Sequence, residues 1–302
     1  MSFDAVRILR ERCVGSMMAS LGVDKNSTVL LLKPLASTEI AAQKAAPQRR
    51  RQAAMDTDPC KCFADRAVHP CLARWGLADE LKAVRVRYDR KGKDEELVRG
   101  ILTDEVRTAL GLPVAEDDAA VRVERLKCEA TTLALFDPVA ACQDVMLGSG
   151  RAKQCPQVVI GGVECDNALR KWLARKKYDR DVASGSRDGE EEDDDERPSV
   201  AVDDNELLYR LFELLCLGGP LAQPDLELEP YLASTKALYR DCVQVYKRSS
   251  DGATCLANEA YEVAGPLVFG AGEQRPLARC FIITEPKRAK ALVVFSPARG
   301  MW

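Results

Sequence analysis

Four residues between positions 60 and 71 have side chains that can bind a metal ion or act as nucleophiles. Cys60, Cys62, His69 and Cys71 follow the spacing C-x-C-x6-H-x-C, and tetrahedral zinc accepts three thiolates and one imidazole. One interpretation is therefore a zinc-stabilised or cysteine-dependent enzyme. Because zinc sites more commonly contain a C-x2-C pair, the favoured interpretation is four separate, reduced side chains without a bound metal.

Other patterns that could support catalysis are incomplete. His69 is the only histidine, so a Ser-His-Asp or Cys-His arrangement would have to use it, and no nucleophile-elbow pattern lies nearby. Gly148 and Gly150 begin like a dinucleotide-binding turn, but Lys153 stands where the third glycine belongs. Cys216 lies between two leucines, which predicts a packed apolar residue rather than a reactive thiolate. We therefore expect no catalytic residues and no cofactor.

The composition limits the classes of partner. With 302 residues, 46% of them hydrophobic and 30% charged, the chain resembles an ordinary soluble globular protein. A net charge of −3 gives no general attraction to nucleic acid or to an anionic membrane. The twelve cysteines, without a signal-like N-terminus, favour reduced thiols in the cytoplasm.

Arg49, Arg50 and Arg51 are interpreted as part of a linker, with a polyanion-binding patch as the alternative.

Two helices between Asp203 and Val245 are expected to organise the fold, and we call them the helical wedge. The first should be buried, because apolar residues recur at helical spacing: Leu207, Leu208, Leu211, Phe212, Leu214 and Leu215. Asp203 and Glu206 resemble a capping pair, and Gly218, Gly219 and Pro220 should end this helix. The second helix is expected to begin near Pro230.

The whole chain is expected to be an α+β protein, with amphipathic helices packed on a mixed or antiparallel sheet. We divide it into an N-terminal helix and flexible linker (1–58), an α/β part (59–183), an acidic disordered linker (184–202), and the helical wedge with antiparallel hairpins (203–302). The acidic segment contains RDGEEEDDDERP, which cannot bury enough apolar area to offset its ordering entropy. One hairpin should join 243–246 to 261–263, and another should join 281–284 to 292–295.

A long stretch of the wedge resembles a known family. The run LFELLCLGGPLAQPDLELEPYLASTKALYRD, from Leu211 to Asp241, is similar to the C-terminal signature of the cilia- and flagella-associated protein 300 family. The similarity continues in FIITEPKRAKALVVF, Phe281 to Phe295, and more weakly in Ala73 to Val86 and Val123 to Pro138. The resemblance implies a role in assembly or transport of outer and inner dynein arms, in the cytoplasm and in the axoneme of the cilium or flagellum. Together with the incomplete catalytic patterns, it leads us to expect a non-enzymatic protein.

The resemblance also implies the kind of partner. These partners are dynein-arm assembly factors of the kintoun type, with the intraflagellar transport machinery and dynein subunits as further candidates, rather than nucleic acid or membrane. We expect them to bind the exposed sides of the helical wedge, through Glu213, Gln223, Glu229, Tyr231, Lys236 and Arg240. Tyr231, Tyr239 and Tyr246 are expected to lie partly in the core and partly at its rim rather than to form a docking stripe.

Overall fold

The computed structural model describes most of the chain after position 54, namely 55, 60–89, 92–113, 119–185, 198, 200–219, 222–270 and 277–297. These residues all belong to one compact unit, 53–302. Nearly all of the expected N-terminal segment 1–58, including Arg49 to Arg51, and most of the acidic linker 184–202 lie outside the described residues.

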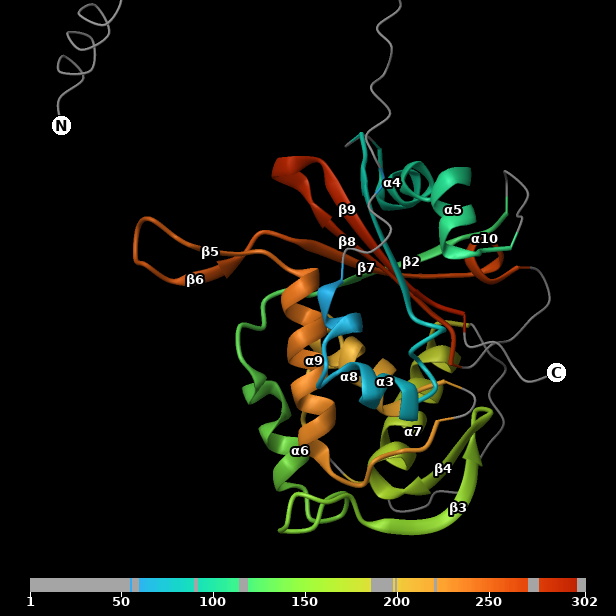
Figure 1. The fold of residues 1–302 in the computed structure, drawn as a ribbon, viewed down its shortest axis with the longest axis vertical. Helices are drawn as coiled ribbons and strands as arrows, with labels where there is room; N and C mark the ends of the chain where they lie inside the picture. Colours follow the sequence, from blue (N-terminus) through green and yellow to red (C-terminus); the bar gives the residue numbers. More distant parts are fainter. Residues whose placement is uncertain are drawn as a thin grey trace, which may run out of the picture. The chain divides into compact units, whose positions relative to one another are not determined.

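A five-stranded antiparallel sheet lies at the centre of the fold (Figure 1). Its strands, in spatial order, are β1 (Lys82–Arg87), β9 (Lys290–Ser296), β8 (Arg279–Glu285), β7 (Glu259–Ala264) and β2 (Arg122–Leu126). Of the three inner strands, β8 and β9 are buried along almost their whole length, which explains why their sequences are continuously apolar rather than alternating. The segments on either side of the acidic linker therefore share one sheet.

One face of the sheet is covered by three short helices. These are α4 (Asp94–Ile101), α5 (Asp104–Leu110) and α10 (Pro266–Phe269), seen above the sheet in Figure 1. Alternate strand residues such as Val84, Ile282 and Val293 face them and form one apolar core. The single helix suggested by the apolar spacing of 94–110 is in fact two, because the chain leaves helical geometry at Leu102 and Thr103.

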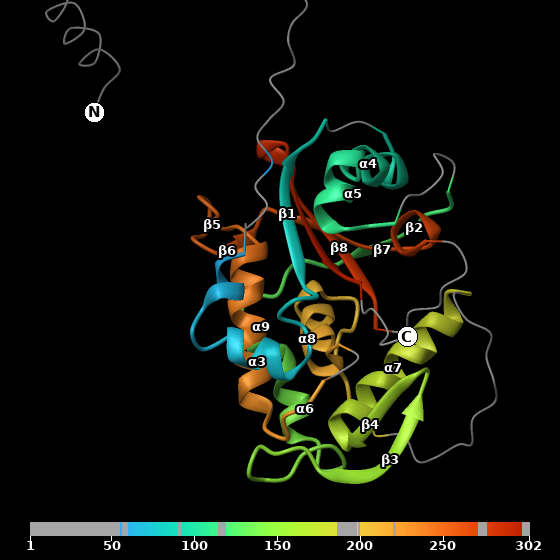
Figure 2. The same cartoon turned by 45° about the vertical axis from the view of Figure 1, so that its right-hand side comes forward.

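The opposite face carries the larger core, whose strand residues include Phe281, Ile283 and Val294. The helices packed there are α3 (His69–Arg74), α6 (Asp137–Ala141), α7 (Ala168–Ala183), α8 (Leu207–Leu217) and α9 (Leu228–Cys242). The short turns η1 (Lys61–Ala64) and η2 (Leu133–Phe136) and the hairpin of β3 (Gln154–Ile160) and β4 (Val163–Asn167) complete this layer. Figure 2 shows these helices and the β3–β4 hairpin on one side of the sheet and α4 and α5 on the other. The predicted α+β fold with an antiparallel sheet is confirmed.

Helix α8 is the most deeply enclosed element, because every residue from Leu207 to Leu217 is buried. The prediction that the first wedge helix is a core element is therefore confirmed. The predicted capping pair at its start is wrong: no side chain caps α8. The Glu206 carboxylate instead accepts hydrogen bonds from the backbone N–H groups of Glu129 and Ala130, so it fastens a distant loop to the start of the helix.

The predicted glycine elbow after α8 exists and packs closely against the end of α3. Gly218 has φ = +64°, and the backbone N–H of Gly219 donates to the Trp75 carbonyl at 2.8 Å. A Cβ atom on Gly219 would lie 2.3 Å from the Gly76 carbonyl oxygen. Since that oxygen belongs to the backbone, the two segments could not approach each other in this way with any larger residue at position 219.

Gly219→Ala is therefore expected to lower the free energy of unfolding by about 2–3 kcal/mol, the usual cost of overpacking. Gly100→Ala is the matched control, since a Cβ at this exposed helical position meets nothing within 4 Å. That variant should be neutral or gain up to about 1 kcal/mol from helix propensity. Urea unfolding of the two variants measures both values, and equal stability would show that the elbow tolerates a side chain.

One of the two predicted hairpins is confirmed and the other is wrong. β8 pairs with β9 through the turn η3 (Pro286–Arg288), as expected. The segment 243–246 does not pair with 261–263: β5 (Val245–Lys247) pairs with β6 (Thr254–Leu256), while β7 pairs with β2 and β8. The turn at Ser249–Gly252 therefore closes a separate two-stranded ribbon.

Candidate functional site

The four potential zinc ligands are not brought together. Cys60 and Cys62 are buried, whereas His69 is exposed and its Nδ1 lies 3.0 Å from the Phe63 carbonyl oxygen. The thiol of Cys71 lies 3.5 Å from the Ala67 carbonyl oxygen. Among the residues that the structure describes, no three His, Cys, Asp or Glu side chains are placed to hold a metal ion.

The buried thiols have environments that favour the protonated form. Cys62 lies next to the Asp241 carboxylate, which accepts from the Cys62 backbone N–H at 2.7 Å. Burial, reinforced by Asp241, raises the pKa of the Cys62 thiol. Burial also raises the pKa of Cys216 well above its usual value, as expected for a packed apolar residue. A nucleophilic cysteine needs the opposite shift.

Two of the six predicted partner-binding residues are in the wrong place for that role. Glu213 has 0% and Tyr231 1% of its surface exposed, so the prediction that both lie on the outside of the wedge is wrong. Tyr231 stacks on Trp75 with ring centroids 4.3 Å apart, and its hydroxyl accepts from the Asp225 backbone N–H at 2.9 Å. Both residues hold the fold together.

The other four predicted residues are exposed: Gln223, Glu229, Lys236 and Arg240. Three of them share one face of α9, because positions 229, 236 and 240 differ by seven and eleven residues. Exposed Ala233 lies in the same line. We call Glu229, Ala233, Lys236 and Arg240 the α9 stripe. Its opposite side, with Tyr231, Leu238 and Cys242, is buried, so the stripe is a solvated helix face on a rigid support.

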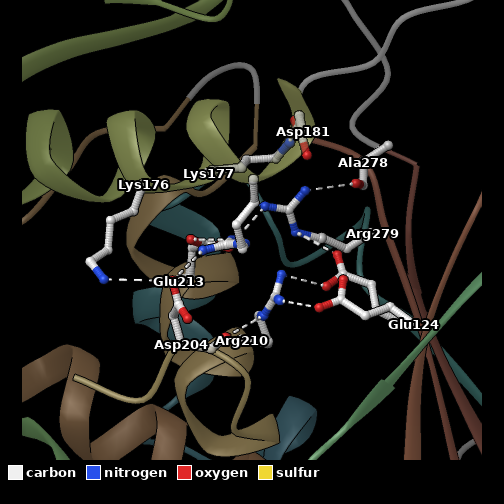
Figure 3. A network of polar contacts seen from close by, with 11 residues as sticks. Glu124, Lys176, Lys177, Asp181, Asp204, Arg210, Glu213, Ala278 and Arg279 are labelled. Atoms are coloured by element: carbon white, nitrogen blue, oxygen red, sulfur yellow. Dashed lines mark hydrogen bonds and ion pairs between the residues drawn. The ribbon is translucent and has the colours of Figure 1, made fainter. Parts of the chain in front are cut away.

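Glu213 is the centre of a buried charge network between α7, α8 and the sheet (Figure 3). Both of its carboxylate oxygens accept from the Arg180 guanidinium, at 2.7 and 2.5 Å, and one also accepts from Arg279 at 3.1 Å. Burial by itself would raise the pKa of Glu213, but the charges of Arg180 and Arg279 outweigh it and lower the pKa to about 2. The carboxylate is therefore ionised in the folded protein.

Arg210 extends this network to two strands. Its guanidinium donates to Glu262 on β7 at 2.9 Å and to Glu124 on β2 at 2.7 Å, while its Nε donates to the Asp204 carbonyl at 2.6 Å. Lys177 forms an ion pair with Asp181, and burial together with the Arg279 charge lowers the pKa of Lys177 to about 8. Positive and negative side chains are balanced in this network, which explains how so many charges are tolerated inside.

Sequence reasoning missed the partners Arg180, Arg210 and Arg279. A signal was available for part of the network, because Arg210 and Glu213 interrupt the apolar run LLYRLFELLCL at adjacent helical positions. A charge within a buried stripe requires an opposite charge nearby. The identity of that partner depended on tertiary packing, since Arg180 and Arg279 lie 33 and 66 residues away.

None of the helices in the described ranges is both long and apolar enough to cross a lipid bilayer.

Comparison with known proteins gives a consistent family. The family model for cilia- and flagella-associated protein 300 matches residues 52–296. A protein of that name from Paramecium tetraurelia is 25% identical over 206 residues, which cover 66% of this chain and 75% of the relative. The one from Chlamydomonas reinhardtii is 24% identical over 261 residues, covering 79% and 94%. No solved structure matches the chain detectably. Since the match extends from the start of the described fold to the last sheet strand, the chain belongs to the cilia- and flagella-associated protein 300 family.

Proposed function

We propose that this protein is a non-enzymatic factor for the assembly or transport of outer and inner dynein arms, and thereby supports the organisation and motility of the axoneme. The observation that carries the proposal is the family match over residues 52–296, which associates the chain with cilia and flagella. The dynein-arm role goes beyond this association with cilia and flagella, and it is supported by the resemblance of the α8–α9 region to the family. In this proposal the protein works in the cytoplasm and in the cilium.

The geometry supports action through surfaces. A rigid core, fixed by the Glu213 network, holds helix α9 with its inner side buried and the α9 stripe in solvent. Such an arrangement presents side chains in a fixed pattern at low entropic cost to a partner. The proposed partners are assembly factors of the kintoun type, and intraflagellar transport proteins or dynein subunits are further candidates.

The alternative of a zinc or cysteine enzyme receives no specific support. It requires Cys60, Cys62, His69 and Cys71 to meet, and two of them are buried while the imidazole is exposed. Raised thiol pKa values at Cys62 and Cys216 also work against nucleophilic chemistry. Metal analysis of the purified full chain tests the alternative directly, and one zinc ion per chain would revive it.

The proposed role is tested by removing the gene from a flagellated cell and examining axoneme cross-sections by electron microscopy. Loss of both rows of dynein arms, with short-lived cytoplasmic dynein heavy chains, is the expected result. Axonemes with complete arms and normal beating would contradict the dynein-arm role. Complete dynein arms together with another axonemal defect would contradict the dynein-arm role but not the association with cilia.

The α9 stripe is the surface that we expect to bind an assembly factor. Lys236→Glu/Arg240→Glu reverses two exposed charges and should weaken capture of a kintoun-type factor by about tenfold or more, because arginine is enriched among interface hot spots and a reversed charge repels the complementary surface. Both side chains are exposed, so the melting temperature should not change. The control Arg66→Glu/Arg122→Glu alters the net charge equally at two exposed positions outside helix α9. Equal capture of both variants would exclude this surface.

A further inference from the structure

The ribbon formed by β5 and β6 is exposed in an unusual way. Of the described residues, only four large apolar side chains are exposed, and two of them are adjacent here: Val245 at 61% and Tyr246 at 42%. Neither belongs to the two apolar cores. Figure 1 shows the ribbon projecting from the sheet and helices around it. A two-stranded ribbon of this size gains little stability by itself, so its exposed apolar residues are not explained by folding.

The base of the ribbon is anchored to the main sheet. The Asn258 side chain accepts from the Gln244 backbone N–H at 2.6 Å and donates to the Thr284 carbonyl of β8 at 3.2 Å. A second link comes from the β8–β9 turn, where the Lys287 ammonium lies 5.3 Å from the centre of the Tyr246 ring. The direction of the ribbon is therefore determined by the main sheet.

Cations outnumber carboxylates on the ribbon and the β8–β9 turn. Five cationic residues lie on the ribbon and the β8–β9 turn, namely Lys247, Arg248, Lys287, Arg288 and Lys290. The two carboxylates of the same segments, Asp251 and Glu285, each lie 3.6 Å from an arginine of their own turn. The chain as a whole has a net charge of −3. This surface thus has the opposite sign to the rest of the protein.

Two of these cations, Lys287 and Arg248, lie near Tyr246. Its cross-strand partner is Cys255, and the Cys255 thiol accepts from the Arg248 guanidinium at 3.3 Å. Lys287 contacts the same ring from the neighbouring turn. An aromatic ring with an ammonium and a guanidinium beside it matches an apolar side chain flanked by carboxylates.

The ribbon also offers free strand edges. Within the described part of the chain, β5 and β6 pair only with each other. Each strand therefore has an outer row of backbone N–H and C=O groups that an extended peptide can bind. Nucleic acid has no peptide backbone with which to pair along such an edge. The free edges therefore favour a polypeptide, and the excess of cations favours an acidic one.

From these features we infer that the β5–β6 ribbon, with the adjoining Lys287–Arg288 turn, is a docking site for an extended acidic segment of a partner protein. The segment adds as a third strand, places an apolar side chain against Tyr246, and sets its carboxylates near Arg248 and Lys287. This site is distinct from the α9 stripe. It goes beyond the proposed ciliary function, and its test uses neither cilia nor an assembly factor.

The test measures fluorescence anisotropy of a labelled synthetic peptide in which glutamate alternates with valine, titrated with the full chain. A peptide of the same length with lysine in place of glutamate tests the sign of the charge, and single-stranded poly-uridine tests nucleic acid. Tyr246→Ala/Lys287→Glu removes the ring and reverses one cation. Arg122→Glu, an exposed charge on β2, an edge strand of the main sheet, is the control variant.

The acidic peptide is expected to bind the unaltered chain and the control, to bind the double variant at least about tenfold more weakly, and to lose affinity as salt rises. The lysine peptide should not bind. The inference is overturned if the acidic peptide does not bind the unaltered chain, if it binds the double variant equally well, or if poly-uridine binds more tightly. Unchanged melting curves for both variants show that the comparison concerns folded protein.

Discussion

Replacing Glu213 with glutamine is expected to lower the free energy of unfolding by about 3–5 kcal/mol, because removal of one partner leaves buried opposite charges uncompensated. Glutamine keeps the size of the side chain, so the loss measures charge rather than packing. Arg180 and Arg279 would then lie in an interior that has lost the carboxylate both of them bind. Urea unfolding provides the measurement, with the exposed Glu229→Gln as a control that should stay within about 0.5 kcal/mol of the original chain.

A double variant distinguishes charge balance from general disturbance. Arg279→Met by itself should also destabilise the protein, since it leaves Glu213 with fewer cations. Combining it with Glu213→Gln removes one charge of each sign, so the combined loss should be clearly smaller than the sum of the two single losses. Additive losses would mean that the two side chains do not depend on each other, contrary to their 3.1 Å contact.

The same carboxylate gives the protein a specific acid sensitivity. The folded-state pKa of Glu213 is about 2, below the usual value of 4.5. A depressed pKa stabilises the fold fully above pH 4.5, and this contribution is lost as the pH falls from 4.5 towards 2. The stability difference between the original chain and Glu213→Gln should therefore shrink over this range. A difference that is constant with pH would show that Glu213 is not ionised in the fold.

Tyr231→Ala is expected to be the second most damaging change, with a loss of about 3–5 kcal/mol. The ring stacks on Trp75 at 4.3 Å in the core, and removing it leaves a cavity beneath α9. Tyr231→Phe keeps the ring and loses only the hydrogen bond from the Asp225 N–H, which should cost about 1 kcal/mol. Thermal and urea unfolding of the pair separate the two contributions.

The result also decides how binding data on Tyr231 are interpreted. If Tyr231→Ala abolishes partner capture, the cause is expected to be loss of folded protein, with Tyr231→Phe binding normally. A stable Tyr231→Ala protein, within about 1 kcal/mol of the original chain, would contradict the burial of this side chain.

Features of the fold could be predicted from the sequence where the pattern that indicates them lies within one short segment. The burial of α8 and the strands β8 and β9 were predictable because their apolar residues are consecutive or at helical spacing. The pairing of β1 with β9 was not, since 208 or so residues separate them and sequence periodicity contains no information about distant neighbours. The apolar residues Leu72, Trp75 and Leu81 favour a helix over 72–83, but α3 ends at Arg74, before Gly76 with φ = +66°.

In the candidate site, too, local patterns were informative and contacts between distant segments were not predictable. Lys236 and Arg240 are exposed, as predicted for the outside of the wedge. Tyr231 is not, because it lies at helical spacing from Leu238 and Cys242 on the buried face of α9. Glu213 looked like a surface residue because it is charged, and only the guanidiniums from α7 and β8 make its burial possible. Tyr231, Tyr239 and Tyr246 were predicted to lie partly in the core and partly at its rim, whereas Tyr246 is exposed on the separate β5–β6 ribbon, outside both cores.

The central claim is that this protein acts through exposed surfaces rather than through chemistry at its cysteines and histidine. The most direct test expresses two variants in a flagellated cell that lacks its own copy and measures beating and the number of dynein arms at equal protein levels. His69→Ala/Cys71→Ser removes the only imidazole and the partly exposed thiol beside it, and it should restore both measurements. Lys236→Glu/Arg240→Glu should restore neither. Restoration by the charge-reversed protein, with failure of the His69→Ala/Cys71→Ser protein, would contradict the claim.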